Sequence, residues 1–232
     1  MKEKGVSDFY DKYSKDQIKT GVHLRHFTLL ARLKKAGLKK DAVVLEVGCG
    51  IGTLTGLLGS YVKNGEIIAT DISPESIDIA RKLNAKHMHI NFEVTDMMEF
   101  VPDKKIDFVV FPDVLEHIPK ENHNRIFKNI CKAIHPGSKF AIHIPDPVNL
   151  DYVRTYQPEL LQIIDQSLYV DDLANAIKDT PLMVDIYERY SLFSKNPDYN
   201  WIVLSVKQPL KEQKKRPKAL MKVIELYRKY NA

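Results

Sequence analysis

The fold of this chain is decided by one stretch, Val43-Val44-Leu45-Glu46-Val47-Gly48-Cys49-Gly50-Ile51-Gly52-Thr53. Its apolar first half is typical of a parallel strand that is buried on both faces. The three glycines at alternate positions have no Cβ atoms, so a flat ligand can lie directly against the backbone. Thr53 is expected to cap a helix that runs through Leu54, Leu57 and Leu58. A strand, a glycine turn and a helix N-terminus together predict a nucleotide-type cofactor site.

The segments after this stretch alternate between expected strands and helices. Further strands are predicted at 66–71, 89–94, 106–111 and 140–144, with a helix opening at Ser73 and another over 119–134. Such alternation predicts a parallel sheet with helices on both faces. The last two strands, near 183–187 and 201–206, are joined only by a loop, so they are expected to pair as an antiparallel hairpin at the sheet edge. The predicted fold class is α/β: a Rossmann-like, doubly wound, seven-stranded sheet, mostly parallel with an antiparallel C-terminal hairpin.

Composition limits the classes of protein that are possible. With 232 residues, 44% hydrophobic and 28% charged, the chain has the composition of a globular protein with one large domain. Two cysteines are too few for a disulfide framework, and neither signal peptide nor membrane span is expected, so a cytoplasmic location is predicted. The net charge of +5 is unevenly distributed: residues 207–232 carry +7 and residues 1–206 carry −2. Basicity is therefore a property of the tail.

Acids follow the predicted strands at regular places. Asp71 ends the second strand, Asp96 follows the third and Asp113 the fourth. With the glycine turn, this order resembles the class I S-adenosylmethionine-dependent methyltransferases over roughly residues 40–207, including the Asp113–Pro119 segment, which is close to what many small-molecule enzymes of that family carry. The resemblance implies S-adenosylmethionine as cofactor, held by Glu46, Gly48, Cys49, Gly50, Gly52, Asp71, Ile72, Asp96, Met97 and Asp113.

The acids in this set have expected roles and plainer alternatives. The resemblance implies that Asp71 binds the ribose hydroxyls and that Asp96 faces the adenine amino group. Ile72 and Met97 follow these acids, and their apolar side chains are expected on the two sides of the adenine ring. Alternatively, Asp71 caps the helix that follows it and Asp96 is an ordinary turn residue.

The glycine turn also separates this family from its main rival, the nicotinamide- or flavin-dependent oxidoreductases. The dinucleotide fingerprint requires Gly or Ala three residues after its second glycine. The two possible frames place Thr53 and Thr55 there, so both fail. Within the turn, Cys49 is interpreted as a small filler and not a nucleophile, and Glu46 as a structural residue or a distant hydrogen-bond acceptor.

Methyl transfer from a sulfonium depends mainly on positioning the nucleophile, because the leaving group is already activated. A base is needed only when the acceptor must lose a proton. His117, after the fourth strand, is the first candidate for this catalytic role, and His143 in the fifth strand is the second. Both can equally be structural hydrogen-bonding residues. No His, Cys or carboxylate spacing fits a metal site, so no metal is expected.

Two segments are candidates for covering the substrate. The insertion at about 146–169 is expected to form a lid over a polar small molecule, with Asp146, Tyr152 and Tyr156 as substrate residues. Residues 1–39 are expected to form a helical lid or cap that contributes Tyr10. The alternative interpretation is that both segments only cap the core.

The domain organisation is thus residues 1–39, a methyltransferase core over 40–207, and a basic linker with an amphipathic helix over 208–232. The expected function is methyl transfer to an O or N atom of a small polar metabolite in a biosynthetic pathway. The alternative is an RNA or protein methyltransferase that recruits its substrate through the tail, and a non-catalytic cofactor-binding scaffold is a third class. Expected partners are the small-molecule acceptor and, through the C-terminal helix, a second copy or another protein; nucleic acid is not expected.

Overall fold

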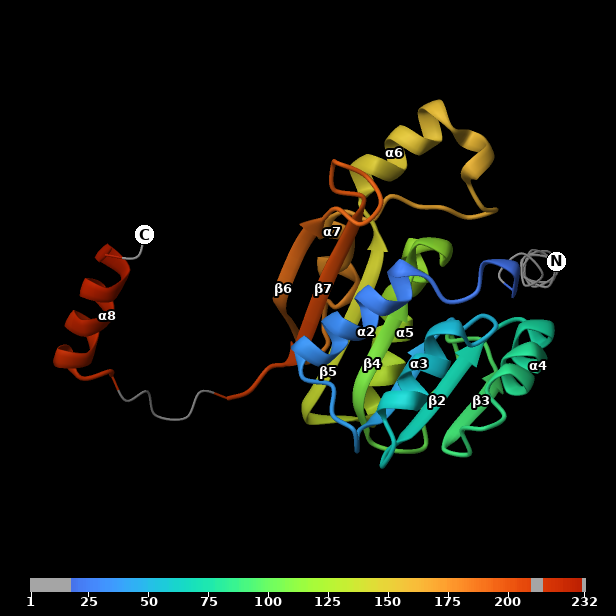
Figure 1. Ribbon diagram of the computed structural model, residues 1–232, viewed down its shortest axis with the longest axis horizontal. Coiled ribbons are helices and arrows are strands. Elements are labelled where there is room, and N and C mark those ends of the chain that lie inside the picture. Colours follow the sequence, from blue (N-terminus) through green and yellow to red (C-terminus); the bar gives the residue numbers. More distant parts are fainter. Residues whose placement is uncertain (1–17, 210–214, 231–232) are drawn as a thin grey trace.

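The computed structural model describes residues 18–209 and 215–230, and its centre is one seven-stranded sheet (Figure 1). The strand order is β3-β2-β1-β4-β5-β7-β6. β1 to β5 are parallel, while β7 is antiparallel to both β5 and β6. The predicted fold class and the antiparallel hairpin are confirmed. The strands are β1 Val43–Val47, β2 Glu66–Asp71, β3 Ile90–Val94, β4 Ile106–Pro112, β5 Ile134–Pro145, β6 Leu182–Tyr190 and β7 Tyr199–Val206.

Helices cover both faces of the sheet because successive residues of its central strands point to opposite sides. Val44 of β1 packs with the helices α2, α3 and α4, whereas the next residue, Leu45, packs with α5 and α7. Both residues are fully buried, as expected for a parallel strand inside three layers. The helices are α2 Leu24–Ala36, α3 Thr53–Tyr61, α4 Pro74–Leu83, α5 Lys120–Ile130, α6 Pro147–Tyr156, α7 Val170–Ala176 and α8 Lys218–Tyr230, and the short 3₁₀ turns are η1 Leu115–His117, η2 Cys131–Ala133 and η3 Pro158–Leu160.

Two predicted boundaries are wrong. The helix expected over 119–134 ends at Ile130, and β5 already begins at Ile134, which pairs with Ile106 of β4. The pairing register of β4 and β5 shifts between this pair and the next one. At this shift the Ser138 hydroxyl donates to the Ile106 carbonyl at 2.6 Å. This hydroxyl satisfies a strand carbonyl at the irregularity, so Pro136 and Gly137 lie inside the strand segment and not before it.

The second correction concerns the start of α3. Gly52, and not Thr53, occupies the N-cap position, with φ +77° and ψ 27°. This left-handed conformation favours glycine, and a Cβ atom there would lie 2.6 Å from Nδ2 of Asn84. The Asn84 amide donates to the Gly52 carbonyl at 3.1 Å, which ties the glycine turn to the end of α4.

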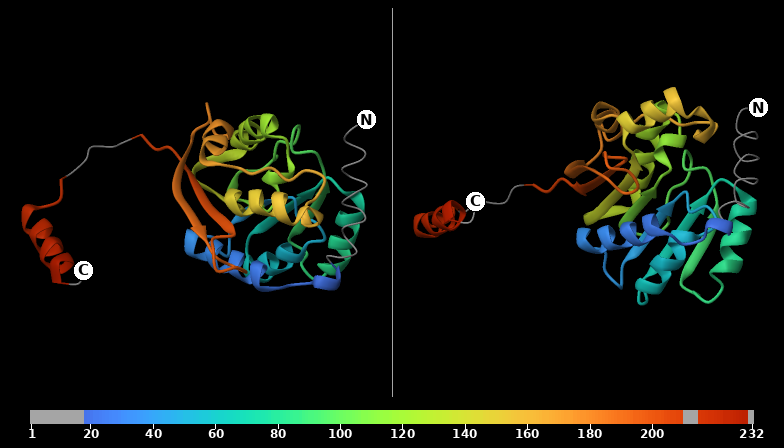
Figure 2. Two further views of the ribbon diagram at one scale, coloured as in Figure 1. Left: turned by 90° about the horizontal axis from the view of Figure 1, so that it is seen from above. Right: turned by 45° about the horizontal axis from the view of Figure 1, so that its top comes forward.

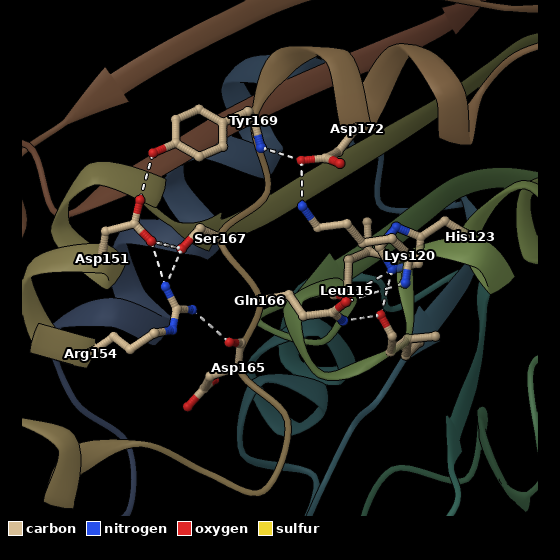
Figure 3. Close-up of polar contacts among 11 residues, drawn as sticks. Leu115, Lys120, His123, Asp151, Arg154, Asp165, Gln166, Ser167, Tyr169 and Asp172 are labelled. Atoms are coloured by element: carbon tan, nitrogen blue, oxygen red, sulfur yellow. Dashed lines mark hydrogen bonds and ion pairs between the residues drawn. The ribbon is translucent and has the colours of Figure 1, made fainter.

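The insertion after β5 contains α6, η3 and a loop over 161–169 that returns toward the core. Figure 3 shows how polar contacts hold it: Arg154 of α6 donates to Ser167 and to the Asp165 carbonyl, and Asp151 accepts from the Tyr169 hydroxyl. The Gln166 side chain donates to the Ile118 carbonyl at 2.7 Å. The returning loop is therefore fastened both to α6 and to the segment between β4 and α5.

The C-terminal helix α8 stands apart from this body in every view (Figures 1 and 2). None of its residues is buried. Among the described helices, α8 included, none has the length and apolar character needed to cross a membrane.

Candidate active site

A cavity of about 440 Å³ lies at the carboxyl ends of the central strands. Its floor comes from the glycine turn and the segments that follow β2, β3 and β4, while α2 and the loop 161–169 contribute to its walls. Nine of the ten predicted cofactor residues line it; Gly52 does not, because it faces α4. The nine are Glu46, Gly48, Cys49, Gly50, Asp71, Ile72, Asp96, Met97 and Asp113.

The glycine turn exposes backbone to this cavity. Gly48 has φ +71°, and a Cβ atom there would lie 2.5 Å from Cγ2 of Val114. The amides of Gly48 and Cys49 both donate to the Thr70 carbonyl, at 2.8 and 2.9 Å. The turn is therefore held against the end of β2, and side chains larger than hydrogen are excluded at Gly48.

Asp71 fixes the other side of the turn. Its carboxylate accepts from the Gly50 amide at 2.8 Å and from the Ser73 amide at 2.9 Å. The N-cap of α4 is Ser73, whose hydroxyl accepts from Ser76, so the alternative interpretation of Asp71 as the N-cap is wrong.

Asp96 and its neighbours form the wall next to Asp71. Oδ1 of Asp96 accepts from the Met98 amide at 2.8 Å, which orients the carboxylate within its turn. Met97 is buried, and its sulfur accepts from the Thr70 hydroxyl at 3.4 Å. Ile72 and Met97 both line the cavity, so two apolar side chains lie close to two acids, an arrangement that suits a flat ring with polar edges.

Glu46 is a fully buried carboxyl group at the end of β1. Neither of its carboxyl oxygens has a hydrogen-bond partner among the described residues. Burial raises its pKa to about 8. The nearby charge of Asp71 acts in the same direction, and the Thr55 hydroxyl acts in the opposite direction. Unpaired buried carboxyl oxygens carry a desolvation cost, so this position favours a ligand that brings a donor or a positive charge.

Asp113 joins α2 to the sheet. It adopts φ +57°, an uncommon conformation for a residue other than glycine. Its carboxylate forms an ion pair with Arg25 of α2 and lies 2.7 Å from Nδ1 of His143. Although burial acts to raise its pKa, Arg25 and His143 lower that pKa to about 2. Asp113 is therefore ionised throughout the neutral range, and its position depends on both partners.

His143, the second candidate base, does not reach the cavity. Its side chain is fully buried, with Nε2 2.7 Å from the Tyr190 hydroxyl and the ring stacked on Tyr199 at 4.3 Å between centroids. It does not line the cavity. The structure therefore gives it a supporting role behind Asp113, and the expectation that it acts as a base has no geometric basis.

His117, the first candidate, does line the cavity. Its Nδ1 lies 2.6 Å from the Ile164 carbonyl and 3.1 Å from Oδ1 of Asp165, while Nε2 lies 3.8 Å from Oε1 of Glu116. Burial acts to lower its pKa, but Glu116, Asp165 and the Ile164 carbonyl together raise it to about 9. This raised pKa favours an imidazolium that donates hydrogen bonds at neutral pH, and it disfavours a role as proton acceptor.

We expect the pH dependence of stability to report this charge. A folded pKa of about 9 lies above the ordinary value of 6.5, so the contribution of His117 is complete below pH 6.5 and is lost as pH rises through about 9. Between these pH values the free energy of unfolding should fall less in His117→Gln than in the wild type, by about 3 kcal/mol at most. Urea unfolding of both proteins from pH 6 to pH 10 measures the difference; parallel profiles would contradict a charged His117.

The predicted substrate residues are not brought to the cavity. Asp146 is buried; it caps α6 by accepting from Val148 and Asn149 and forms an ion pair with Arg189 at 2.6 Å. Tyr152 and Tyr156 pack against each other on α6 and are more than half exposed. None of these three residues lines the cavity. Tyr10 lies outside the described residues.

The walls contain residues that were not predicted as site residues. Arg25 and His26 come from α2, and Gln162 and Ile164 from the loop 161–169. The sequence did predict these two segments as covers, but only the folded chain indicates which of their side chains face inward. Among the described residues, no three His, Cys, Asp or Glu side chains gather as metal ligands.

Comparison with known proteins agrees with this geometry. Residues 44–137 match the sequence model of the methyltransferase domain family. Over this segment the chain is similar to the methyltransferase domain family, and its fold is that of the class I methyltransferases. The matched segment runs from β1 into β5 and so contains the glycine turn, Asp71 and Asp96. The resemblance inferred from the motifs is confirmed.

The chain is similar to several proteins that are named as methyltransferases. It is 27% identical over 132 residues to malonyl-[acyl-carrier protein] O-methyltransferase 1 of Ilyobacter polytropus, covering 57% of this chain and 46% of that protein. It is 27% identical over 118 residues to trans-aconitate 2-methyltransferase of Methylobacterium radiotolerans, covering 51% and 42%. The chain spans less than half the length of these relatives.

Among solved structures, magnesium protoporphyrin IX methyltransferase from Synechocystis PCC 6803, with bound SAH, superposes with a TM-score of 0.69. The sequence identity is 15%, and the superposition covers 89% of this chain and 100% of that one. The likeness extends to the edge strands and so supports the fold of the whole core.

Proposed function

We propose that this methyltransferase transfers a methyl group from S-adenosylmethionine to a small molecule. One observation carries the proposal: the glycine turn, Asp71, Asp96 and the unpaired Glu46 all face a single cavity. The family match and the SAH bound in the Synechocystis relative support the choice of cofactor. S-adenosylmethionine supplies a methyl group on a positively charged sulfonium, which needs no further activation.

The electrostatics of the cavity fit this cofactor. Three carboxylates line it, those of Asp71, Asp96 and Asp113, against the cations Arg25 and His117, while the raised pKa of Glu46 keeps that carboxyl group mainly neutral until a cation binds beside it. S-adenosylmethionine has a sulfonium, an ammonium and one carboxylate, so its net charge is positive and is attracted by an acidic lining. A dinucleotide brings a negatively charged pyrophosphate, which this lining repels. The charge balance therefore favours the sulfonium cofactor, in agreement with the failed dinucleotide frames.

We assign roles to the residues at the cofactor end as follows. Asp71 accepts hydrogen bonds from the ribose hydroxyls, Asp96 accepts from the adenine amino group, and Ile72 and Met97 contact the ring. Gly48 leaves the backbone bare for close approach, because a Cβ there would collide with Val114. Each assignment rests on the residue's place in the cavity wall.

We place the methyl acceptor between α2 and the loop 161–169. The cavity is bounded there by Arg25 and His26 on one side and by His117, Gln162 and Ile164 on the other. Walls from two covering segments suit a small molecule better than a polymer, and the names of the Ilyobacter and Methylobacterium relatives point the same way. Since the raised pKa of His117 favours its charged form at neutral pH, it orients the acceptor and does not deprotonate it. The acceptor is an O or N nucleophile.

Calorimetric titration of the full chain tests the cofactor assignment. We expect S-adenosylhomocysteine to bind in a one-to-one complex and NAD to give no heat at the same concentrations. S-adenosylhomocysteine keeps the ribose, the adenine and the amino acid, so it reports on Glu46, Asp71 and Asp96 together. Binding of NAD with no binding of S-adenosylhomocysteine would overturn the proposal.

A further inference from the structure

Helix α8 (Lys218–Tyr230) is amphipathic and lies away from the core. At 100° per residue, one side of the helix carries a continuous apolar stripe and the other side carries four basic residues and one acid. Stripe residues that would be buried in a packed helix are exposed, such as Val223 at 61% and Leu226 at 54%. The stripe comprises Ala219, Leu220, Val223, Ile224, Leu226, Tyr227 and Tyr230, and the opposite side Lys218, Lys222, Glu225, Arg228 and Lys229.

The connection between β7 and α8 lets this helix reach a surface beside the core. At the end of β7, the Lys207 amide donates to the Pro181 carbonyl at 2.7 Å, and the Gln208 side chain donates to the Pro136 carbonyl at 2.8 Å. Residues 209–217 follow, and nine residues span up to about 30 Å when extended. They include the basic Lys211, Lys214, Lys215 and Arg216.

The two sides of α8 restrict what can cover it. A nucleic acid would satisfy the basic side but leave the apolar stripe in water. A second copy of α8 would satisfy the stripe, but Lys222 and Arg228 border the stripe on its two sides and would face like charges across such a pair. A surface with an apolar interior and negative charges at its boundary can contact the apolar stripe and the basic side at the same time. A membrane that contains anionic lipids has this combination.

We propose that α8 docks in the plane of an anionic lipid surface, with its stripe in the acyl boundary and its basic side at the headgroups. Thirteen residues make a helix of about 20 Å, too short to span a bilayer core of about 30 Å, so it lies on the surface. The basic linker adds attraction close to the same surface. The methyltransferase core, which carries −2 over residues 1–206, stays off the membrane on its tether.

Vesicle flotation of the full chain tests this docking. We expect flotation with vesicles of phosphatidylcholine and phosphatidylglycerol in a 7:3 ratio (about 30% anionic lipid) at low salt, and none with phosphatidylcholine alone. Lys222→Glu/Lys229→Glu should lower the partition coefficient by about 30-fold or more, since each basic residue near such a surface contributes about fivefold. Lys63→Glu/Lys86→Glu makes the same change of charge at exposed positions on the core and should leave partitioning unchanged.

A second pair of variants tests the stripe. Val223→Ser/Leu226→Ser should abolish flotation, whereas Met221→Ser, which lies outside the stripe, should reduce it only slightly. Far-UV circular dichroism and methyl-transfer activity of the core should be the same in all variants. Equal binding to neutral and anionic vesicles, or equal partition of the two charge-reversal pairs, would overturn the proposal. So would a dimer in light scattering that dissociates in Val223→Ser/Leu226→Ser.

Discussion

Asp71→Ala is expected to raise the dissociation constant for S-adenosylhomocysteine by at least about 100-fold. Two effects add. First, the ligand loses an ionised acceptor for its ribose hydroxyls, and each hydrogen bond to a charged group contributes about 1.5–3 kcal/mol. The Gly50 amide also loses its partner at 2.8 Å, which loosens the glycine turn itself. Isothermal titration of the variant against the wild-type protein measures the change.

Two further variants separate these effects. Asp71→Asn keeps an oxygen that can accept from the Gly50 amide, so it should bind more tightly than Asp71→Ala but more weakly than the wild type. Asp78→Ala removes an exposed acid of α4 that forms an ion pair with Arg81, and should bind as the wild type does. Binding by Asp71→Ala within threefold of the wild type would contradict the assigned role of Asp71.

Asp113→Ala is expected to cost at most about 3 kcal/mol of unfolding free energy, because it removes the carboxylate shared by the fully buried His143 and the partly exposed Arg25. Denaturant unfolding at pH 7 measures this loss. Since the pKa of Asp113 is lowered to about 2, its contribution is complete above pH 3.8 and disappears as pH falls through about 2. The difference between variant and wild type should therefore shrink in acid.

Asp113→Gly distinguishes the charge from the backbone. Glycine adopts φ +57° without the strain that alanine meets there, so Asp113→Gly should be more stable than Asp113→Ala by about 1 kcal/mol. It should still fail to hold Arg25, and in a double-mutant cycle with Arg25→Met the two losses should be less than additive. Additive losses would show that the Arg25–Asp113 pair is not a coupled unit.

The sequence was most informative for those parts of the site that depend on the backbone geometry of short, continuous segments. The glycine turn, its flanking strand and the acids that end β2 and follow β3 all occur at fixed places along the chain, so their meeting at one sheet edge follows from parallel topology. The hairpin β6–β7 could be predicted because its two strands are joined by a loop too short for a crossover. These features needed no knowledge of distant contacts.

The failures have a common physical cause. In β5 both faces are buried, so no polar alternation indicates that His143 points under α2 and away from the cavity. Asp146 follows the same strand, but its partner Arg189 is 43 residues away, and sequence gives no sign of that pair. Likewise His117 has the appearance of a base until Asp165, from the returning loop, is placed beside it. Local sequence predicts residue type and edge of the sheet, whereas protonation state depends on neighbours that only the fold supplies.

The walls of the cavity have a consequence for cooperativity. They come from α2 near the start of the described chain, from the turns after β1, β2 and β4, and from residues 162–164 beyond α6. They are spread over residues 25–164, so the cavity is complete only when segments that are far apart in the sequence have packed together. A ligand present at 100 times its dissociation constant would then add about 2.7 kcal/mol to the folding of the whole core. Occupancy and folding are in this sense coupled equilibria, so the concentration of the ligand changes the stability of the folded chain as well as the occupancy of its cavity.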